Sequence, residues 1–134
     1  MEAFVLFITP HERDVDEVAG ILESADMPME HANCLTEAKS RLEHNKYKVV
    51  LTEAQLQDGG WTDVLCTARR LDPTVQVIVT DPFADVRFWA EAINLGAYDV
   101  LAQPFEGSEV VRILSSASGL KCRPIERAAA AYFG

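Results

Sequence analysis

Short apolar runs alternate with stretches of helix-like spacing along most of this chain. The runs that are typical of strands cover residues 3–8, 29–33, 47–53, 75–80 and 98–102. Between and after them, apolar residues recur every three or four positions over residues 11–25, 35–42, 61–71, 84–94 and 108–118. Strands that alternate with helices are typical of a parallel sheet covered on both faces. The pattern therefore predicts an α/β fold with five strands and five helices.

Turn-forming residues separate these elements. Asp58-Gly59-Gly60 closes a loop that begins at Ala54, and Asp72-Pro73 ends the helix before the fourth strand. Gly96 follows an amphipathic segment and is expected to cap it at the carboxyl end. No internal repeat or low-complexity segment interrupts this alternation, so a single compact domain is expected.

Composition and charge narrow the classes of function. The chain has 134 residues, of which 49% are hydrophobic and 25% charged, which is ordinary for a globular domain. Its net charge of -9 opposes binding to nucleic-acid phosphates or anionic lipid. No apolar run approaches the roughly 20 residues of a membrane span, and the amino terminus lacks the features of a secretory signal. We therefore expect a cytoplasmic protein without nucleic acid or membrane as partners.

Polar side chains stand at the ends of three predicted strands. Glu53 ends the third strand, Thr80 ends the fourth, and Gln103-Pro104-Phe105 follows the fifth. In open parallel α/β sheets, the carboxyl ends of the strands form the crevice where ligands and chemistry are found. These three positions are therefore predicted to line one site.

The order and spacing of these landmarks resemble the receiver domain of two-component response regulators over residues 3–118. In that family a phosphate-accepting Asp stands at the position of Glu53, Ser or Thr at that of Thr80, and Lys at that of Gln103, before Pro104 and Phe105. The resemblance implies a flavodoxin-like (CheY-like), doubly wound five-stranded parallel sheet with strand order 2-1-3-4-5. It also implies a regulatory domain of phosphorelay signal transduction rather than an enzyme.

Several positions depart from the family pattern. The acid pair that holds magnesium in the family is replaced by Thr9-Pro10, and the lysine by Gln103. Glu12 is the only nearby side chain that could substitute as a metal ligand, and Mg²⁺ requires a near-octahedral set of oxygen ligands. We therefore expect the magnesium site to be lost and no cofactor to be bound. The family's switch aromatic on the fifth strand is replaced by Val100, whose small side chain cannot swing between two pockets.

Glu53 is open to three interpretations. Its carboxylate reaches one methylene further than that of an Asp, and so could imitate a phosphorylated receiver in a fixed state. It could also retain some phosphorylation, or be a strand-end side chain without any signalling role. The sequence around Glu53 does not distinguish imitation of a phosphorylated receiver from a side chain without any signalling role.

The partner surface is expected over residues 84–118, used for self-association or for contact with a fused or separate effector. Trp89, Tyr98 and Phe105 are the candidate contact residues. Trp89 follows another aromatic on a helix, so both rings cannot easily face one core, and alternation directs Tyr98 toward the same side as Val100. A core role for these aromatics stays open.

Two other functions also stay open. One is a working phosphoacceptor for a sensor histidine kinase, with Glu53 or Asp58 receiving phosphate. The other is a purely structural module of a larger regulator. Residues 119–134 change in composition, with three basic side chains and a helix-prone, apolar end. They are compatible with a packed terminal helix or with the start of a linker to an effector, and an origin as an expression tag is less favoured.

Overall fold

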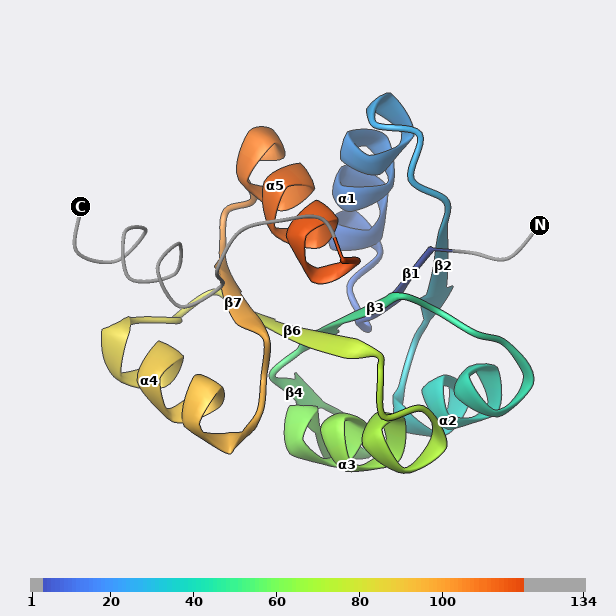
Figure 1. Cartoon of the computed structure of the whole chain (residues 1–134). Helices are drawn as coiled ribbons and strands as arrows, with labels where there is room; N and C mark the ends of the chain where they lie inside the picture. Colours follow the sequence, from blue (N-terminus) through green and yellow to red (C-terminus); the bar gives the residue numbers. More distant parts are fainter. Residues whose placement is uncertain (1–3, 120–134) are drawn as a thin grey trace.

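The computed structural model describes residues 4–119, which form a five-stranded parallel sheet with helices on both faces (Figure 1). The sheet has the order β2-β1-β3-β6-β7, which confirms the predicted order of the five main strands. Its strands are β1 (Val5–Ile8), β2 (Met29–Ala32), β3 (Val49–Glu53), β6 (Gln76–Asp81) and β7 (Asp99–Ala102). The helices are α1 (Glu12–Ser24), α2 (Leu35–His44), α3 (Trp61–Leu71), α4 (Val86–Leu95) and α5 (Gly107–Ala117).

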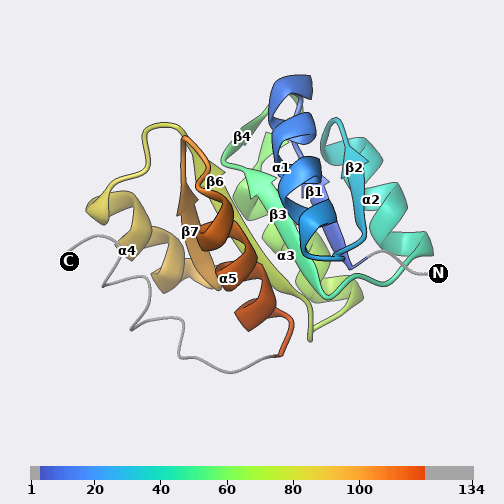
Figure 2. The same cartoon turned by 90° about the horizontal axis from the view of Figure 1, so that it is seen from above.

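The helices form two layers. Helices α1 and α5 lie on one face of the sheet, and α2, α3 and α4 on the other (Figures 1 and 2). Successive strand residues alternate between the two cores, so that Val49 and Leu51 pack under α1 and α5 while Val50 packs on the opposite face. All five residues of β3 are buried. This is why the central strands read as continuous apolar runs rather than as alternating patterns.

The predicted boundaries differ from the structure mainly in the loops. The segment expected as a plain loop, 54–60, contains a short antiparallel hairpin of β4 (Gln55–Leu56) and β5 (Gly59–Gly60). Gly96 ends α4 as predicted: its φ of 120° is open to glycine, and its N–H bonds to the carbonyl of Ala92. The interpretation of residues 120–134 as a helix or linker lies outside the described residues.

Phe105 takes part in the core between the sheet and the α1 and α5 layer. It is 9% exposed, and its ring meets Phe7 edge-on, with ring centroids 6.4 Å apart and an interplanar angle of 88°. This is a favourable geometry for two aromatic rings. Phe105 is therefore a core residue, although the sequence suggested it as a contact residue. Within the described part of the chain, no helix is long and apolar enough to cross a membrane.

Replacing Phe105 by Ala should lower the free energy of unfolding by about 3–5 kcal/mol, because it leaves a cavity beside Phe7. Phe83→Ala is the matched control, since Phe83 is 87% exposed and its loss should change stability by no more than about 0.5 kcal/mol. Urea denaturation measures both. Equal effects of the two substitutions would contradict the assignment of Phe105 to the core.

Candidate functional site

The structure brings Glu53, Thr80 and Gln103 together at the carboxyl edge of the sheet. Glu53 is the last residue of β3 and lies in register with Thr80 of β6. Gln103 follows β7 directly and precedes Pro104 through a cis peptide bond. In a parallel sheet all strands run in the same direction, so their carboxyl ends lie together at one end of the sheet. The three side chains therefore reach one another although they are up to 50 residues apart in the sequence.

Hydrogen bonds join these side chains into one network. Gln103 Nε2 donates to Glu53 Oε2 at 3.4 Å and to Thr80 Oγ1 at 3.1 Å. The Thr80 hydroxyl donates to the backbone carbonyl of Leu101 at 2.7 Å, so its oxygen is left as an acceptor for Gln103. Thr9 Oγ1, at the end of β1, donates to Glu53 Oε2 at 3.2 Å. The network thus links the ends of β1, β3, β6 and β7.

Thr9 is held in place by two further contacts. The backbone N–H of His11 donates to Thr9 Oγ1 at 3.1 Å, and His31 Nε2 lies 2.7 Å from the Thr9 carbonyl oxygen. A carbonyl oxygen can only accept, so His31 carries its proton on Nε2. The Thr9 hydroxyl therefore donates to Glu53 and accepts from the N–H of His11, just before α1.

Glu53 is almost fully enclosed, with 4% of its surface exposed. Its pKa is raised from the ordinary 4.5 to about 7, mainly because burial disfavours the charged form. The carboxyl group of Asp14 raises this pKa further, while the donors on Thr9 and Gln103 lower it. Glu53 is thus a carboxyl group that is readily protonated near neutral pH.

Asp14 is the site residue that sequence reasoning passed over. It lies in the first turn of α1 and is partly exposed, whereas Glu12, the suggested substitute ligand, is exposed to solvent. A signal for it was present: Asp14, Val18 and Leu22 follow one another at four-residue spacing, and the latter two are buried. Asp14 therefore lies on the helix face that is directed at the sheet.

The residues at this edge do not fit the magnesium site that the family pattern implies. Mg²⁺ requires a near-octahedral set of oxygen ligands and usually takes carboxylates. The positions of the acid pair hold Thr9, whose hydroxyl donates its proton to Glu53, and Pro10, which brings no acidic oxygen. Nowhere in residues 4–119 do three or more His, Cys, Asp or Glu side chains gather in a way that suits a metal ion.

Asp58, the second carboxylate considered as a phosphate acceptor, caps helix α2. Its Oδ1 accepts from the N–H of Leu35 at 2.8 Å, and its Oδ2 accepts from the N–H and hydroxyl of Thr36 at 3.0 and 2.9 Å. These bonds satisfy N–H groups at the start of the helix. The N–H of Leu35, and then that of Thr36, lower the pKa of Asp58 from 3.8 to about 2. Both of its oxygens are engaged in a structural role.

Val100 and the candidate contact residues occupy different environments. Val100 is buried in the core under α2, α3 and α4, whereas Tyr98 packs partly against the opposite core. The expectation that both face the same side is therefore wrong, because Tyr98 precedes β7 and does not follow its alternation.

Trp89 is half-buried against the core under α4, and Pro104 is exposed. The large apolar side chains with high exposure near this surface are instead Phe83 and Leu95.

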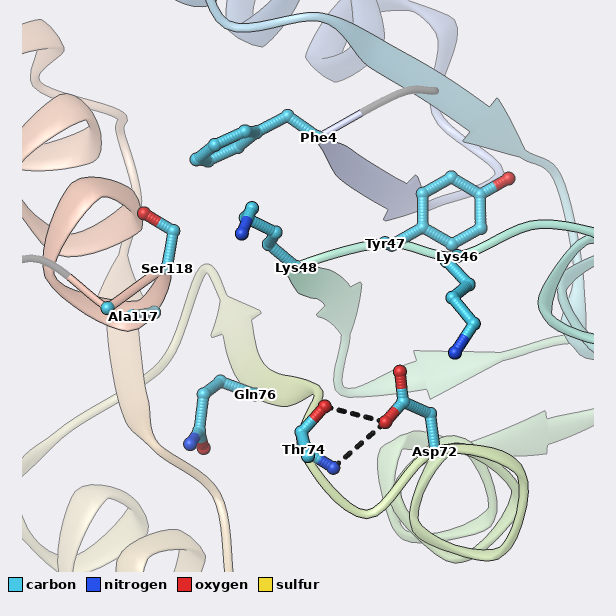
Figure 3. A pocket seen from close by; sticks show the side chains of 10 residues that line it. Phe4, Lys46, Tyr47, Lys48, Asp72, Thr74, Gln76, Ala117 and Ser118 are labelled. Atoms are coloured by element: carbon cyan, nitrogen blue, oxygen red, sulfur yellow. Dashed lines mark hydrogen bonds between the residues drawn. The ribbon is translucent and has the colours of Figure 1, made fainter. Parts of the chain in front are cut away.

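A cavity lies at the opposite end of the sheet, away from Glu53. It measures about 560 Å³ and opens at the amino ends of the strands, between Phe4, Lys48 and Ser118 (Figure 3). On its far side Asp72 Oδ1 accepts from the N–H and hydroxyl of Thr74, at 3.0 and 2.7 Å. None of the predicted site residues lines it. The cavity and Glu53 therefore lie at opposite ends of the strands, so the cavity is not part of the site around Glu53.

Comparisons with known proteins agree with this architecture. The model of the response regulator receiver domain family matches residues 5–115. The photosynthetic apparatus regulatory protein RegA of Cereibacter sphaeroides is 23% identical over 110 residues, which cover 82% of this chain and 60% of RegA. The chain thus spans somewhat more than half the length of that relative.

Solved structures resemble the chain in fold. A CheY-like receiver domain protein from Methanospirillum hungatei has a TM-score of 0.78 at 19% identity, covering 88% of this chain and 94% of its own. The beryllofluoride-activated receiver domain dimer of NtrC4 has a TM-score of 0.78 at 24% identity, covering 84% and 93%. At these identities the likeness concerns the fold.

Replacing Asp58 by Ala should lower the melting temperature, because the first N–H groups of α2 lose their acceptor. The effect should depend on pH. The folded-state pKa of Asp58 lies below its ordinary value, so the stabilisation is complete above about pH 4 and is lost as pH falls toward about 2.

Thermal unfolding followed by circular dichroism tests this, with Asp16→Ala on the exposed side of α1 as the control. The deficit of the Asp58 variant should be constant above about pH 4 and shrink below it. A deficit that is the same at every pH would contradict the capping role of the charged carboxylate.

Proposed function

The chain belongs to the response regulator receiver domain family, and from this premise we propose that it is an atypical receiver that signals by protein contact without the standard phosphorylation of an Asp. Two-component signal transduction is the process in which such domains act. The receiver is a regulatory module, and we assign it no enzymatic reaction. Its expected setting is the cytoplasm, and its expected partners are proteins rather than nucleic acid or membrane.

The observation that carries the proposal is the enclosure of Glu53. A phosphate acceptor must expose a carboxylate oxygen to an incoming phosphoryl group, with positive charge nearby to stabilise the transferred oxygens. Here Glu53 Oε2 accepts from Thr9 and Gln103, and the whole side chain is 4% exposed. The carboxyl group is thus engaged in hydrogen bonds within the protein, and the nearby Asp14 adds negative rather than positive potential.

Gln103 supports the same conclusion from the other side of the site. A lysine at this position would bring a positive charge to the phosphoryl oxygens. Gln103 brings a neutral amide, and that amide already bonds to both Glu53 and Thr80. In this arrangement the glutamine holds the site in one state rather than responding to phosphate. This favours a fixed-state site over a strand-end side chain without a role, since the Gln103 amide engages two partners, Glu53 and Thr80.

The proposed contact surface consists of α4, β7 and α5, within residues 84–118, with the exposed Leu95 and the half-buried Trp89 and Tyr98 as its apolar part. Self-association is the proposed mode of contact. The solved NtrC4 receiver is described as a dimer, so the fold is compatible with this mode. A fused or separate effector, and a sensor histidine kinase, are the alternative partners of the same surface.

Incubation with a small phosphodonor and Mg²⁺ should leave the intact mass of the protein unchanged. The physical reason is that the site offers an enclosed carboxyl group, no lysine and no acid pair. A receiver domain that keeps the acid pair, the Asp and the Lys is the positive control. A mass gain that disappears in Glu53→Gln, or in Asp58→Asn, would establish a working phosphoacceptor and overturn the proposal.

Light scattering should detect self-association, and Leu95→Lys should weaken it by about tenfold or more, because it places a charge in the apolar surface of α4. Leu71→Lys is the matched control: Leu71 is 40% exposed, comparable with 52% for Leu95, but it ends α3. A monomer at all concentrations, or equal effects of both substitutions, would count against this contact surface.

A further inference from the structure

The cavity at the amino ends of the strands is built by three neighbouring strands and by the end of α5. The backbone N–H of Lys48 donates to the Phe4 carbonyl at 3.0 Å, and the N–H of Gln76 donates to the Lys48 carbonyl at 3.3 Å. These bonds hold the three residues next to one another where β1, β3 and β6 begin. Ala117 and Ser118, at the end of α5, line the opposite side (Figure 3). The lining thus belongs to packed strands and a helix, which hold side chains in place better than a loop does.

The charged side chains of this cavity do not balance, because two lysines and one aspartate line it. Asp72 is already engaged: its Oδ1 accepts from the hydroxyl and the N–H of Thr74, and the Lys46 ammonium points toward its carboxylate (Figure 3). The bonds from Thr74 lower the pKa of Asp72, and the charge of Lys46 lowers it further. Within residues 4–119, no carboxylate forms an ion pair with Lys48. The positive charge of Lys48 is therefore available to a ligand.

The space beside Lys48 is bounded by apolar groups. Figure 3 shows the Lys48 ammonium between the ring of Phe4 and the end of α5, where Ala117 presents a methyl group. The methylene stem of a lysine is itself apolar and can pack against a ligand while its ammonium stays polar. A ligand in this space would meet one cation next to an aromatic ring.

Two neutral polar side chains also line this part of the cavity. The Ser118 hydroxyl donates to the backbone carbonyl of Ser115 at 2.8 Å, so its proton is already used within α5. Gln76 is partly exposed, and its side-chain amide can donate two hydrogen bonds. The donors that remain for a ligand are therefore the Lys48 ammonium and the Gln76 amide. Such donors favour a group that only accepts, and an ionised carboxylate is one.

We propose that this cavity binds a small organic anion with a flat apolar body, an aromatic carboxylate, whose carboxylate pairs with Lys48 and whose rings pack against Phe4 and Ala117. The volume of about 560 Å³ suits a small molecule, since such sites measure roughly 300–1,000 Å³. The net charge of -9 opposes a polyanion, whereas one carboxylate requires only the local charge of Lys48. The site lies away from Glu53, and the inference does not depend on the proposed function.

The test is a titration of the whole isotope-labelled chain with naphthoate at low ionic strength, followed by NMR of the backbone N–H groups. The signals of Lys48, Gln76 and Ser118 should shift along one saturable curve, with a dissociation constant of about 1 mM or lower. Naphthamide has the same rings without the charge and should bind about tenfold more weakly or less. Added salt should weaken the binding of naphthoate and leave that of naphthamide unchanged, because salt screens an exposed charge pair.

Substitutions assign the binding to one lysine. Lys48→Gln should weaken the binding of naphthoate by about tenfold or more and leave that of naphthamide nearly unchanged. Lys39→Gln is the matched control, since Lys39 is exposed on α2 and does not line the cavity. Lys46→Gln should have a smaller effect than Lys48→Gln, because Lys46 faces Asp72. All three lysines are exposed, so the variants should fold, which circular dichroism checks.

Several outcomes would overturn this site. They are the absence of saturable shifts up to about 10 mM naphthoate, equal affinity for naphthoate and naphthamide, and an unchanged affinity in Lys48→Gln. Shifts confined to the surroundings of Glu53 would place the ligand at the other end of the strands and would equally contradict it. Neither phosphorylation nor self-association enters these measurements, so their failure would leave the proposed function as it stands.

Discussion

The structure depends on a constraint imposed by its buried parallel sheet. With helices on both faces, all of β3 is buried, and its polar side chains, Thr52 and Glu53, stand at its carboxyl end. Glu53 stands at that edge but is still enclosed, and a carboxyl group in such a place must be neutralised or hydrogen-bonded. Thr9 and Gln103 supply hydrogen bonds to this carboxyl group, while burial and the nearby Asp14 favour its neutral form by raising its pKa.

The same constraint explains why the site couples distant parts of the chain. The hydrogen-bond partners of Glu53, Thr9 and Gln103, follow different strands, so the network joins strand ends that are far apart in the sequence. Thr80 and Gln103 extend it toward β7 and the start of α5. In a site with a free carboxylate and a bound cation these connections would be made by the ion and its ligands. Here side-chain hydrogen bonds make them directly.

The sequence predicted the fold more fully than the site. The apolar runs and helical spacings determine the order of elements, because burial on two faces leaves a pattern in the chain itself. Glu53, Thr80 and Gln103 could be placed together for the same reason, since they follow predicted strands. Asp58 could not be recognised as a cap of α2, because its partners Leu35 and Thr36 precede it by 23 and 22 residues and belong to another element. The closeness of Asp14 to Glu53 likewise depends on how α1 is seated on the sheet.

The cavity beside Ser118 lies where the described part of the chain ends. Ser118 and Gly119 line it at the amino ends of the strands, whereas Glu53 lies at the carboxyl ends. The 11 residues of α5 connect these two edges over about 16 Å. Helix α5 is therefore a described element that connects the Glu53 end of the sheet to the cavity at Ser118, so that a displacement of this helix would change the surroundings of both.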